Sequence, residues 1–477
     1  PLVLPFPRIL KRTTMKPLIS GRKSPLSALR CAGSTLLAAL SLLAAAPVAH
    51  AVPSFARQTG ADCAACHVGA FGPQLTPYGI KFKLGGYTET DGKDGKVPLS
   101  AMLVGSYTQT KKNQADRPAD NASVNKNVAF DEASLFLAGR LSEKIGAFIQ
   151  ATYDGIGRST ALDQMDIRAA HTFELAGKET IIGLSLNNNP GVQDPFNTMP
   201  VWGFPYTSSA LAFGLGGAGT LINGGLEQRV TGLSAYTFWN NLLYAEIGTY
   251  RSLSPTTQSK FGLGRADDIG RLGGGTVYWR LAAFQDMKKQ AFNVGVFGLN
   301  TSLQTDRSAP ERNKFNDLGV DASYQFLGTR KHVATVNTSF IRERQTRDAW
   351  LAAGEADNRK GHLNEFKLNG SYHYDQTWGA TVGRFLTTGT ADGALYAAGN
   401  GDFSFARNSP NSSGYILQAD WTPWGKETSW NAPWANLRLG AQYTMFTKFN
   451  GATSDYDGNG RNAKDNNTLF LFGWVSF

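Results

Sequence analysis

The sequence predicts an all-β protein, a 16-stranded antiparallel transmembrane β-barrel whose lumen is plugged or capped by a small N-terminal segment. From about Val97 onward, apolar and polar residues alternate with period two in segments of 10 to 15 residues. Short and long connections between these segments alternate along the chain. The last segment is apolar and ends on an aromatic residue, Phe477. Bacterial single-chain barrels combine an even number of strands with short turns at one end and long loops at the other.

The first 51 residues have the pattern of an export leader. Met15 is the expected start, so residues 1–14 are upstream sequence and 15–51 a signal peptide with an apolar run and a small-residue cleavage site at Ala49–Ala51. The leader holds seven of the 47 Lys and Arg residues and no acidic residue, which leaves 40 basic against 37 acidic residues, or +3. The basic character therefore belongs mostly to the leader, and no nucleic-acid partner is expected.

Sixteen strands are predicted between residue 97 and the C-terminus. They lie near 97–109, 127–141, 144–154, 164–175, 179–188, 225–238, 241–252, 273–285, 291–303, 314–326, 331–344, 361–375, 378–388, 413–422, 434–448 and 467–477. No stretch after the leader has 18 consecutive apolar residues, so no transmembrane helix is expected.

The two faces of the predicted strands decide between a soluble sandwich and a membrane barrel, which composition alone leaves open. In the strand near 361–375, Phe366 and Tyr372 alternate with Glu365, Lys367 and other polar residues. A sandwich buries its apolar face and needs no aromatic ends. An outer-membrane barrel turns its apolar face to lipid and its polar face to a wet lumen, which fits the pattern.

The lengths of the connections predict the orientation. Two or three residues join some neighbouring strands, whereas long connections cover about 110–126, 188–224, 253–272, 345–360, 389–412 and 449–466. Short turns lie on the periplasmic side of such barrels and long loops outside, so both termini are expected in the periplasm. The longest loop, 188–224, is rich in Pro, Asn and Gly and is a candidate to fold inward as a constriction.

Cys63-Ala64-Ala65-Cys66-His67 is the strongest motif of the chain. The spacing is that of c-type haem attachment, in which each thiol forms a thioether with the porphyrin and the histidine becomes the proximal iron ligand. A redox CxxC pair does not need the histidine, and a zinc site needs two further ligands nearby that are missing. We therefore expect one covalent haem c on Cys63 and Cys66, with His67 on the iron.

Residues 52–95 are expected to form the monohaem cytochrome segment, and 96–477 the porin-like barrel. So short a segment cannot bury an ordinary core unaided. A covalent haem supplies an apolar body, and a 16-stranded barrel encloses a channel wide enough for a plug.

The N-terminal segment also resembles a known family, the fused monohaem cytochrome–porins of the bacterial outer membrane, best known from iron-oxidising bacteria. The residues that carry the resemblance are VPSFARQTG at 52–60, CAACH at 63–67, Pro73, LTPYG at 75–79 and KFKLGGYT at 81–88. Two departures are Tyr78, for a usual phenylalanine, and Ile80, where the family has an arginine that could serve a haem propionate. Lys81 and Lys83 are candidate substitutes for that arginine.

The resemblance implies a function as well as a cofactor. It implies an extracellular Fe(II) oxidase that passes electrons through a haem in the lumen to a periplasmic cytochrome or other carrier, with outer-membrane lipid around the barrel. Two alternatives remain open at this point. One is a diffusion porin with an accessory haem segment, and the other is an outward conduit to an extracellular acceptor, since one haem motif does not set the direction of flow.

The second axial ligand of the iron is not evident from the motif. Between Val52 and Ala101, His67 is the only histidine and there is no methionine. Met102 and His373 fall on lumen-facing positions of their predicted strands near the periplasmic end, and each is a candidate ligand. Two alternatives stay open: both residues only line the lumen, or the iron binds water or has an open sixth position. His171 falls on the lipid-facing side and is discounted.

Overall fold

The structure is a computed structural model that describes residues 53–93, 96–263, 270–397 and 404–477. The expectations for residues 1–51 therefore lie outside the described residues. Within the described ranges, no helix is long and apolar enough to cross a membrane.

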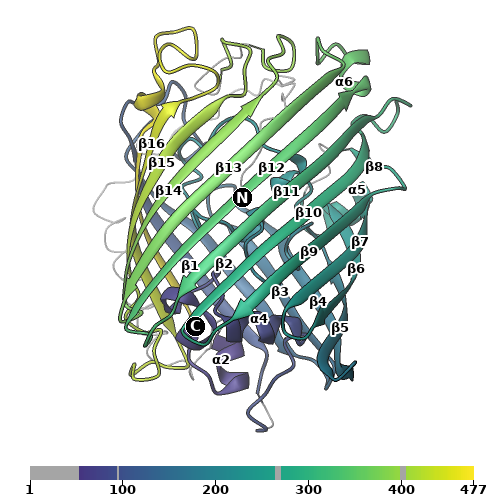
Figure 1. Ribbon diagram of the computed structural model, residues 1–477. Helices are drawn as coiled ribbons and strands as arrows, with labels where there is room; N and C mark the ends of the chain where they lie inside the picture. The colour runs from purple at the N-terminus through teal and green to yellow at the C-terminus, as the bar shows by residue number, and fades with distance from the viewer. Residues whose placement is uncertain (1–52, 94–95, 264–269, 398–403) are drawn as a thin grey trace, which may run out of the picture. The chain divides into compact units, whose positions relative to one another are not determined.

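Antiparallel strands make the wall of a closed barrel (Figure 1). They are β1 (Leu99–Thr110), β2 (Asn127–Arg140), β3 (Ile145–Asp154), β4 (Ser159–Leu175), β5 (Lys178–Asn187), β6 (Val230–Trp239), β7 (Leu243–Ser252), β9 (Val277–Asp286), β10 (Gln290–Gln304), β11 (Asn313–Phe326), β12 (His332–Arg347), β13 (Lys360–Tyr374), β14 (Trp378–Gly389), β15 (Ser412–Trp421), β16 (Asn436–Lys448) and β17 (Thr468–Ser476). β1 pairs with both β2 and β17, which closes the sheet. The two-residue β8 (Arg271–Leu272) pairs with the end of β10 and is not a separate strand of the barrel wall. The predicted sixteen strands are therefore confirmed.

The predicted strand limits differ most for β4 and β6. β4 begins five residues early because its first residues pair with β3 beyond a register shift between Ile149 and Ala151, which the pattern does not reveal. β6 begins at Val230 rather than 225. The residues before it belong to the preceding connection, where Leu226 is buried among other apolar side chains.

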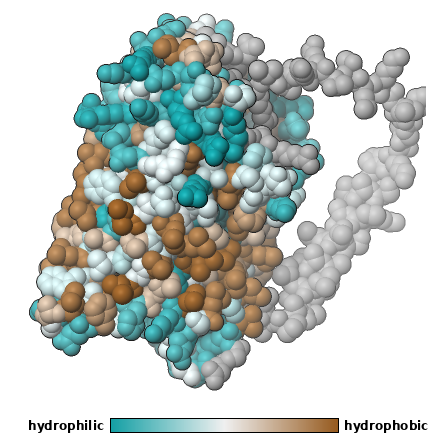
Figure 2. Space-filling view, turned by 90° about the vertical axis from the view of Figure 1, so that its right-hand side faces the viewer, coloured by the Kyte–Doolittle hydropathy of each residue, from teal (hydrophilic) through white to brown (hydrophobic). Residues whose placement is uncertain are grey.

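Alternation along each strand separates an outer apolar face from an inner face. On β1, Leu99 is 55% exposed whereas Met102 is 6% exposed, and on β2, Leu135 is 68% exposed. Figure 2 shows hydrophobic residues in a broad band over the middle and lower part of the barrel and hydrophilic residues over the upper end. An exterior of this kind is that of barrels that face lipid.

The connection between β5 and β6, residues 188–229 and here called the inner loop, folds into the lumen as the sequence suggested. Its Met199 and Leu226 pack against Tyr250, Tyr278 and Phe297 of the barrel wall. The lumen is thus lined with side chains that are buried rather than wet.

The N-terminal segment lies at the lower end of the barrel, where the C-terminus also lies (Figure 1). We call this the terminal end and the opposite one the loop end. The segment contains α2 (Pro53–Thr59), α3 (Cys63–Cys66), the 3₁₀ turn η1 (Val68–Ala70) and α4 (Pro77–Leu84). Its α2 is bound to the first hairpin, since Ser54 Oγ donates to the Ala138 carbonyl at 2.6 Å and Arg57 donates to the Leu99 carbonyl at 2.6 Å.

Candidate haem-attachment site

The two cysteines lie on one short helical turn, α3. Asp62 caps it by accepting the Ala65 N–H at 2.8 Å, and the His67 N–H donates to the Cys63 carbonyl at 2.8 Å. Both thiols are half-buried and form no disulfide. A three-residue spacing on a helical turn brings the two side chains to one side, which is what two bonds to one porphyrin require.

The turn is held by the chain that follows it. The Thr76 N–H donates to the Cys66 carbonyl at 2.9 Å, and the Val68 N–H donates to the Gln74 carbonyl at 3.0 Å. At Gly79 a Cβ atom would approach the Cys66 carbonyl oxygen closer than van der Waals contact allows. Glycine at this position lets α4 pack directly against the cysteine turn.

The electrostatics of the turn favour neutral side chains. Burial, with the charge of Asp62, raises the pKa of the Cys63 thiol to about 12, and burial raises that of Cys66 to about 12. Burial lowers the pKa of His67 to about 4, so its imidazole is neutral at pH 7. Its Nδ1 is buried with no hydrogen-bond partner among the described residues. Two thiols beside one neutral imidazole fit a c-type haem, whose iron takes an uncharged ring nitrogen.

Turns at the terminal end of the barrel complete the surroundings. The Ala64 N–H donates to the Gly425 carbonyl at 3.1 Å, and Asn436 Nδ2 donates to the Ala70 carbonyl at 2.7 Å. The Gly69 N–H donates to Gln376 Oε1 at 3.0 Å. The connection between β15 and β16, residues 422–435, is longer than the other turns at this end, and it covers the cysteine turn. The sequence pattern did not predict that Gly425, Asn436 and Gln376 contact the N-terminal segment. The unusual length of the connection at 422–435 was the one feature of the sequence that pointed to a contact there.

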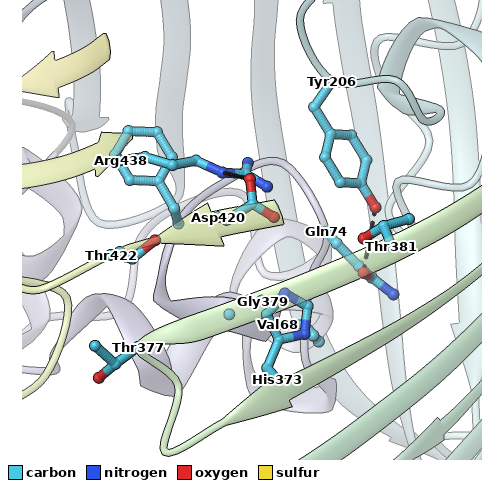
Figure 3. A pocket seen from close by; sticks show the side chains of 12 residues that line it. Val68, Gln74, Tyr206, His373, Thr377, Gly379, Thr381, Asp420, Thr422 and Arg438 are labelled. Carbon is cyan, nitrogen blue, oxygen red and sulfur yellow. Dashed lines mark hydrogen bonds and ion pairs between the residues drawn. The ribbon is translucent and has the colours of Figure 1, made fainter. Parts of the chain in front are cut away.

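His373 faces the lumen from β13, as predicted, and lies against the N-terminal segment, residues 53–93, which we call the haem-attachment segment. Its Nε2 is 2.5 Å from the position that a Cβ of Gly69 would take, so only glycine fits there. Its Nδ1 has no partner among the described residues. Figure 3 shows His373 beside Val68, in a cavity of about 340 Å³ that Asp420 and Arg438 also line.

Met102 also faces the lumen, as predicted, but its sulfur is engaged. The indole N–H of Trp474 donates to Met102 Sδ. Met102 packs in an apolar cluster with Phe136, and the Trp474 ring contacts that of Phe71 at 4.8 Å between centroids. Both ligand candidates thus lie close to the segment that follows His67.

The two lysine candidates for a propionate have other contacts. Lys81 is exposed and forms an ion pair with Glu179 of β5 at 2.9 Å. Lys83 is buried, and its Nζ donates to the Val192 carbonyl at 2.8 Å and to Asn197 Oδ1 at 2.9 Å. Burial beside Arg168 lowers the pKa of Lys83 to about 7. Lys83 therefore binds the inner loop to α4.

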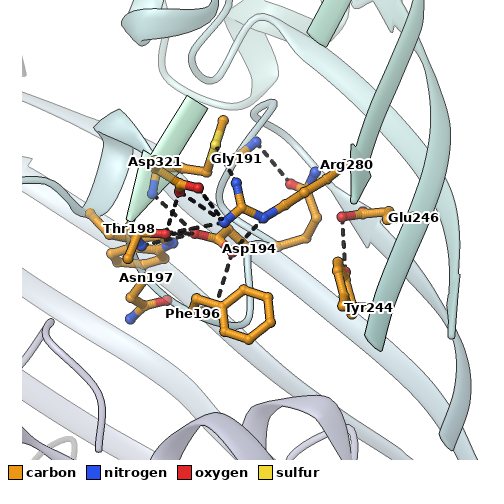
Figure 4. Close-up of polar contacts among 12 residues, drawn as sticks. Gly191, Asp194, Phe196, Asn197, Thr198, Tyr244, Glu246, Arg280 and Asp321 are labelled. Atoms are coloured by element: carbon orange, nitrogen blue, oxygen red, sulfur yellow. Dashed lines mark hydrogen bonds and ion pairs between the residues drawn. The ribbon is translucent and has the colours of Figure 1, made fainter. Parts of the chain in front are cut away.

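Two fully buried arginines fix the inner loop. Arg168 of β4 forms an ion pair with Asp166 at 2.8 Å and donates to the carbonyls of Lys83 and Gln193. Arg280 of β9 lies between Asp194 of the loop and Asp321 of β11, with ion pairs at 3.3 and 2.8 Å (Figure 4). Removing one partner of a buried ion pair is strongly destabilising, so these contacts hold the loop in place.

No ready-made site for a second metal ion is evident. Within the described ranges, no group of three or more His, Cys, Asp or Glu side chains is placed to hold a metal ion.

Comparisons with known proteins give only distant likenesses. No family model and no curated protein matches the chain. Among solved structures, OprB of Pseudomonas putida is 12% identical with a TM-score of 0.45, and the match covers 80% of this chain and 94% of that chain. The anion-selective porin of Comamonas acidovorans is 12% identical with a TM-score of 0.43, covering 79% and 98%. The outer-membrane channel DcaP of Acinetobacter baumannii is 9% identical with a TM-score of 0.40, covering 80% and 96%. The barrel is therefore established by the strand pairing of the chain itself.

Proposed function

We propose that this protein is an outer-membrane electron-transfer protein that oxidises extracellular Fe(II) through one c-type haem on Cys63, Cys66 and His67. Each Fe(II) gives up one electron and becomes Fe(III). A haem bound here supplies a one-electron acceptor, and a periplasmic cytochrome or other carrier takes the electron on. Both termini lie on the periplasmic side, and the apolar exterior contacts outer-membrane lipid.

The placement of the CAACH turn carries this proposal. Its thiols and its neutral imidazole lie on one capped turn, which the barrel contacts through Gly425, Asn436 and Gln376. A porphyrin bonded there is held at the mouth of a transmembrane barrel. The protein around it keeps the imidazole uncharged and fixes the turn, so the chain orients the iron and limits its contact with water.

The filled lumen favours electron transfer over solute diffusion. In an open porin the lumen-facing polar residues border water. Here Arg168 and Arg280 are 0% exposed, and Glu343 is 1% exposed. A hydrated sugar needs an open channel, whereas an electron passes to the haem from any donor that comes within tunnelling distance of it.

Of the two ligand candidates, His373 is the better second axial ligand. Its Nδ1 lacks a partner, it borders a cavity, and it lies against Gly69, two residues from His67. The Met102 sulfur already accepts the Trp474 indole N–H. We therefore include His373 in the proposed haem site and Met102 in the surrounding apolar cluster.

Anaerobic mixing of the purified, oxidised holoprotein with Fe(II), followed at the α and Soret bands, tests the function. We expect fast reduction that disappears when Fe(II) is blocked by a chelator. The Cys63→Ser, Cys66→Ser double variant is the control and should show no c-type bands. Reduction by dithionite but not by Fe(II) would exclude Fe(II) as the donor. A wild-type protein matured in a host that attaches haem c, yet without c-type bands, would exclude the haem itself.

A further inference from the structure

A second cavity lies in the lumen beside the segment that follows the cysteine turn. It contains about 490 Å³ of space free of atoms, part of which is open to solvent. Gln74 of the haem-attachment segment lines it together with the inner loop and the lumen face of β11, β12 and β13. Gln74 and Tyr206 line both this cavity and the one at His373 (Figure 3), so the two are neighbours.

Three buried side-chain atoms on the lining of this cavity lack a partner among the described residues: two amide donors and one acceptor, Gln325 Oε1. Gln74 Nε2 and Asn369 Nδ2 have no partner among the described residues, and these residues are 7% and 6% exposed. Lys367 is the only charged residue among those described that line the cavity, and no described ion pair includes it. Buried donors without partners cost free energy, so such a set indicates an acceptor that the protein chain itself does not provide.

The nearest carboxylate on the same face of β13 does not satisfy Lys367. Glu365 Oε1 accepts the Thr220 N–H at 2.6 Å, and Glu365 Oε2 accepts Asn223 Nδ2 at 2.6 Å. Both oxygens of Glu365 are therefore committed to the inner loop. The cavity offers a ligand one cation and two amide donors, and a carboxylate is the group that accepts from all three, whereas Gln325 Oε1 stays available to a donor.

We propose that this cavity holds the propionate carboxylates of the haem, with Lys367 as their cationic partner and Gln74 and Asn369 as hydrogen-bond donors. This inference rests on the proposed function, because the carboxylates belong to the haem on the cysteine turn. Gln74 is tied to that turn by its carbonyl, which accepts the Val68 N–H at 3.0 Å. The neighbouring Leu75 carbonyl accepts Gln325 Nε2 at 2.7 Å, which fixes the segment against β11.

The placement of His373 agrees with this assignment. His373 and Lys367 lie on the lumen face of the same strand, with His373 toward the terminal end. Six residues of strand span about 20 Å, so His373 and Lys367 lie at two neighbouring cavities, which share Gln74 and Tyr206 as lining residues. In this assignment Lys367 of the barrel wall takes the role that the resemblance gives to an arginine at position 80.

The midpoint potential of the haem in the full-length holoprotein tests the proposal. A cation beside the propionates disfavours the ferric state, so Lys367→Met should lower the potential and Lys367→Arg should keep it near the wild-type value. The control is Lys360→Met, on the same strand but exposed at the loop end, which should leave the potential unchanged. The propionate bending band in resonance Raman spectra should shift in Lys367→Met and in Asn369→Leu.

The outcomes separate this inference from the proposed function. An unchanged potential and an unchanged propionate band in Lys367→Met, with normal α and Soret bands, overturn the propionate site and leave the haem standing. A shift that occurs only with added acetate would assign the cavity to a free carboxylate and overturn it as well. If Lys367→Met does not fold, the propionate band of Asn369→Leu decides: a shifted band supports the propionate site, and an unchanged band overturns it. Absence of c-type bands in the wild type would instead remove the proposed function.

Discussion

His373 has an unusual position for a lumen-facing residue of a barrel. Its imidazole meets the backbone of Gly69, so β13 and the haem-attachment segment approach each other as closely as a glycine permits. An imidazole with an unpartnered buried nitrogen loses hydrogen-bonding free energy unless something binds it. The proposed role as an axial ligand would supply a partner for an imidazole nitrogen of His373.

The first prediction concerns this side chain. His373→Ala should shift the Soret band and change the midpoint potential of the haem, because the axial ligand sets both the ligand field and the stability of each oxidation state. Visible spectroscopy and a redox titration of the holoprotein measure these changes. His171→Ala, an exposed position on the outer face of β4, is the matched control. An unchanged spectrum in His373→Ala would remove His373 as a ligand and return attention to Met102.

The second prediction concerns Gly79. Gly79→Ala should destabilise the haem-attachment segment by about 1–3 kcal/mol, because the added methyl group meets the Cys66 carbonyl and pushes α4 from the cysteine turn. Gly85→Ala is the control, since a Cβ there makes ordinary contacts at 3.4 Å or more. The yield of covalently bound haem per protein and the thermal midpoint measure the effect. Equal yields from both variants would show that α4 does not position the turn.

At the scale of elements, the inner loop is the part that turns a porin-like barrel into a closed one. Asp194 receives the backbone N–H groups of Thr198 and Met199 at 2.9 and 3.0 Å and also pairs with Arg280. The loop is therefore folded around a carboxylate that the barrel wall neutralises. Asp321, on the other side of Arg280, accepts two further hydrogen bonds from Arg280 Nη2, at 3.1 and 2.8 Å.

The third prediction follows from that arrangement. Arg280→Met should leave Asp194 and Asp321 as unpaired buried charges at a cost of about 3–5 kcal/mol, and the inner loop should leave the lumen. Single-channel conductance in planar bilayers should then rise from near zero to a measurable value. Arg359→Met, which breaks an exposed ion pair with Asp348, is the control and should leave the conductance unchanged. A closed pore in Arg280→Met would mean that apolar packing alone holds the loop.

The sequence was sufficient to predict the strands, because the pattern that marks each strand lies within its own residues. Alternation of apolar and polar residues located all sixteen strands, because each strand has one lipid face and one lumen face. It failed at residues 225–229, where Leu226 is apolar through burial in the inner loop rather than through membership of a strand. The same alternation placed Met102 and His373 on the lumen faces of their strands, and both placements are confirmed.

The rest of the site depends on contacts between distant segments, which no local pattern contains. Gly69 and Gln376 are 307 positions apart, yet the N–H of one donates to the side chain of the other. The partners of Lys81 and Lys83, and the cavity that Lys367 and Gln74 both line, likewise depend on how the segment and the inner loop enter the barrel. The CAACH motif was readable because its chemistry lies within five consecutive residues.

At the scale of the whole molecule, the barrel has the wall of a porin but, over the described residues, lacks the water-filled channel that an ordinary porin encloses. It crosses the membrane, but its lumen contains the inner loop and borders the haem-attachment segment instead of a water column. Electrons and solutes should therefore behave differently in the same protein. A measurement on sealed vesicles can follow both at once.

The fourth prediction uses that difference. Vesicles carrying the holoprotein and a trapped soluble c-type cytochrome should show reduction of the trapped cytochrome when Fe(II) is added outside, with no release of a trapped sugar. The reason is that an electron needs only a donor and an acceptor within tunnelling distance of the haem. The sugar is blocked by the inner loop, which Arg168 and Arg280 hold in the lumen. Absorbance of the trapped cytochrome and an assay of released sugar measure the two processes. The Cys63→Ser, Cys66→Ser variant should abolish the first without changing the second. Sugar release at the rate of an open porin would instead establish diffusion as the function, because an open lumen also lets Fe(II) reach the trapped cytochrome directly.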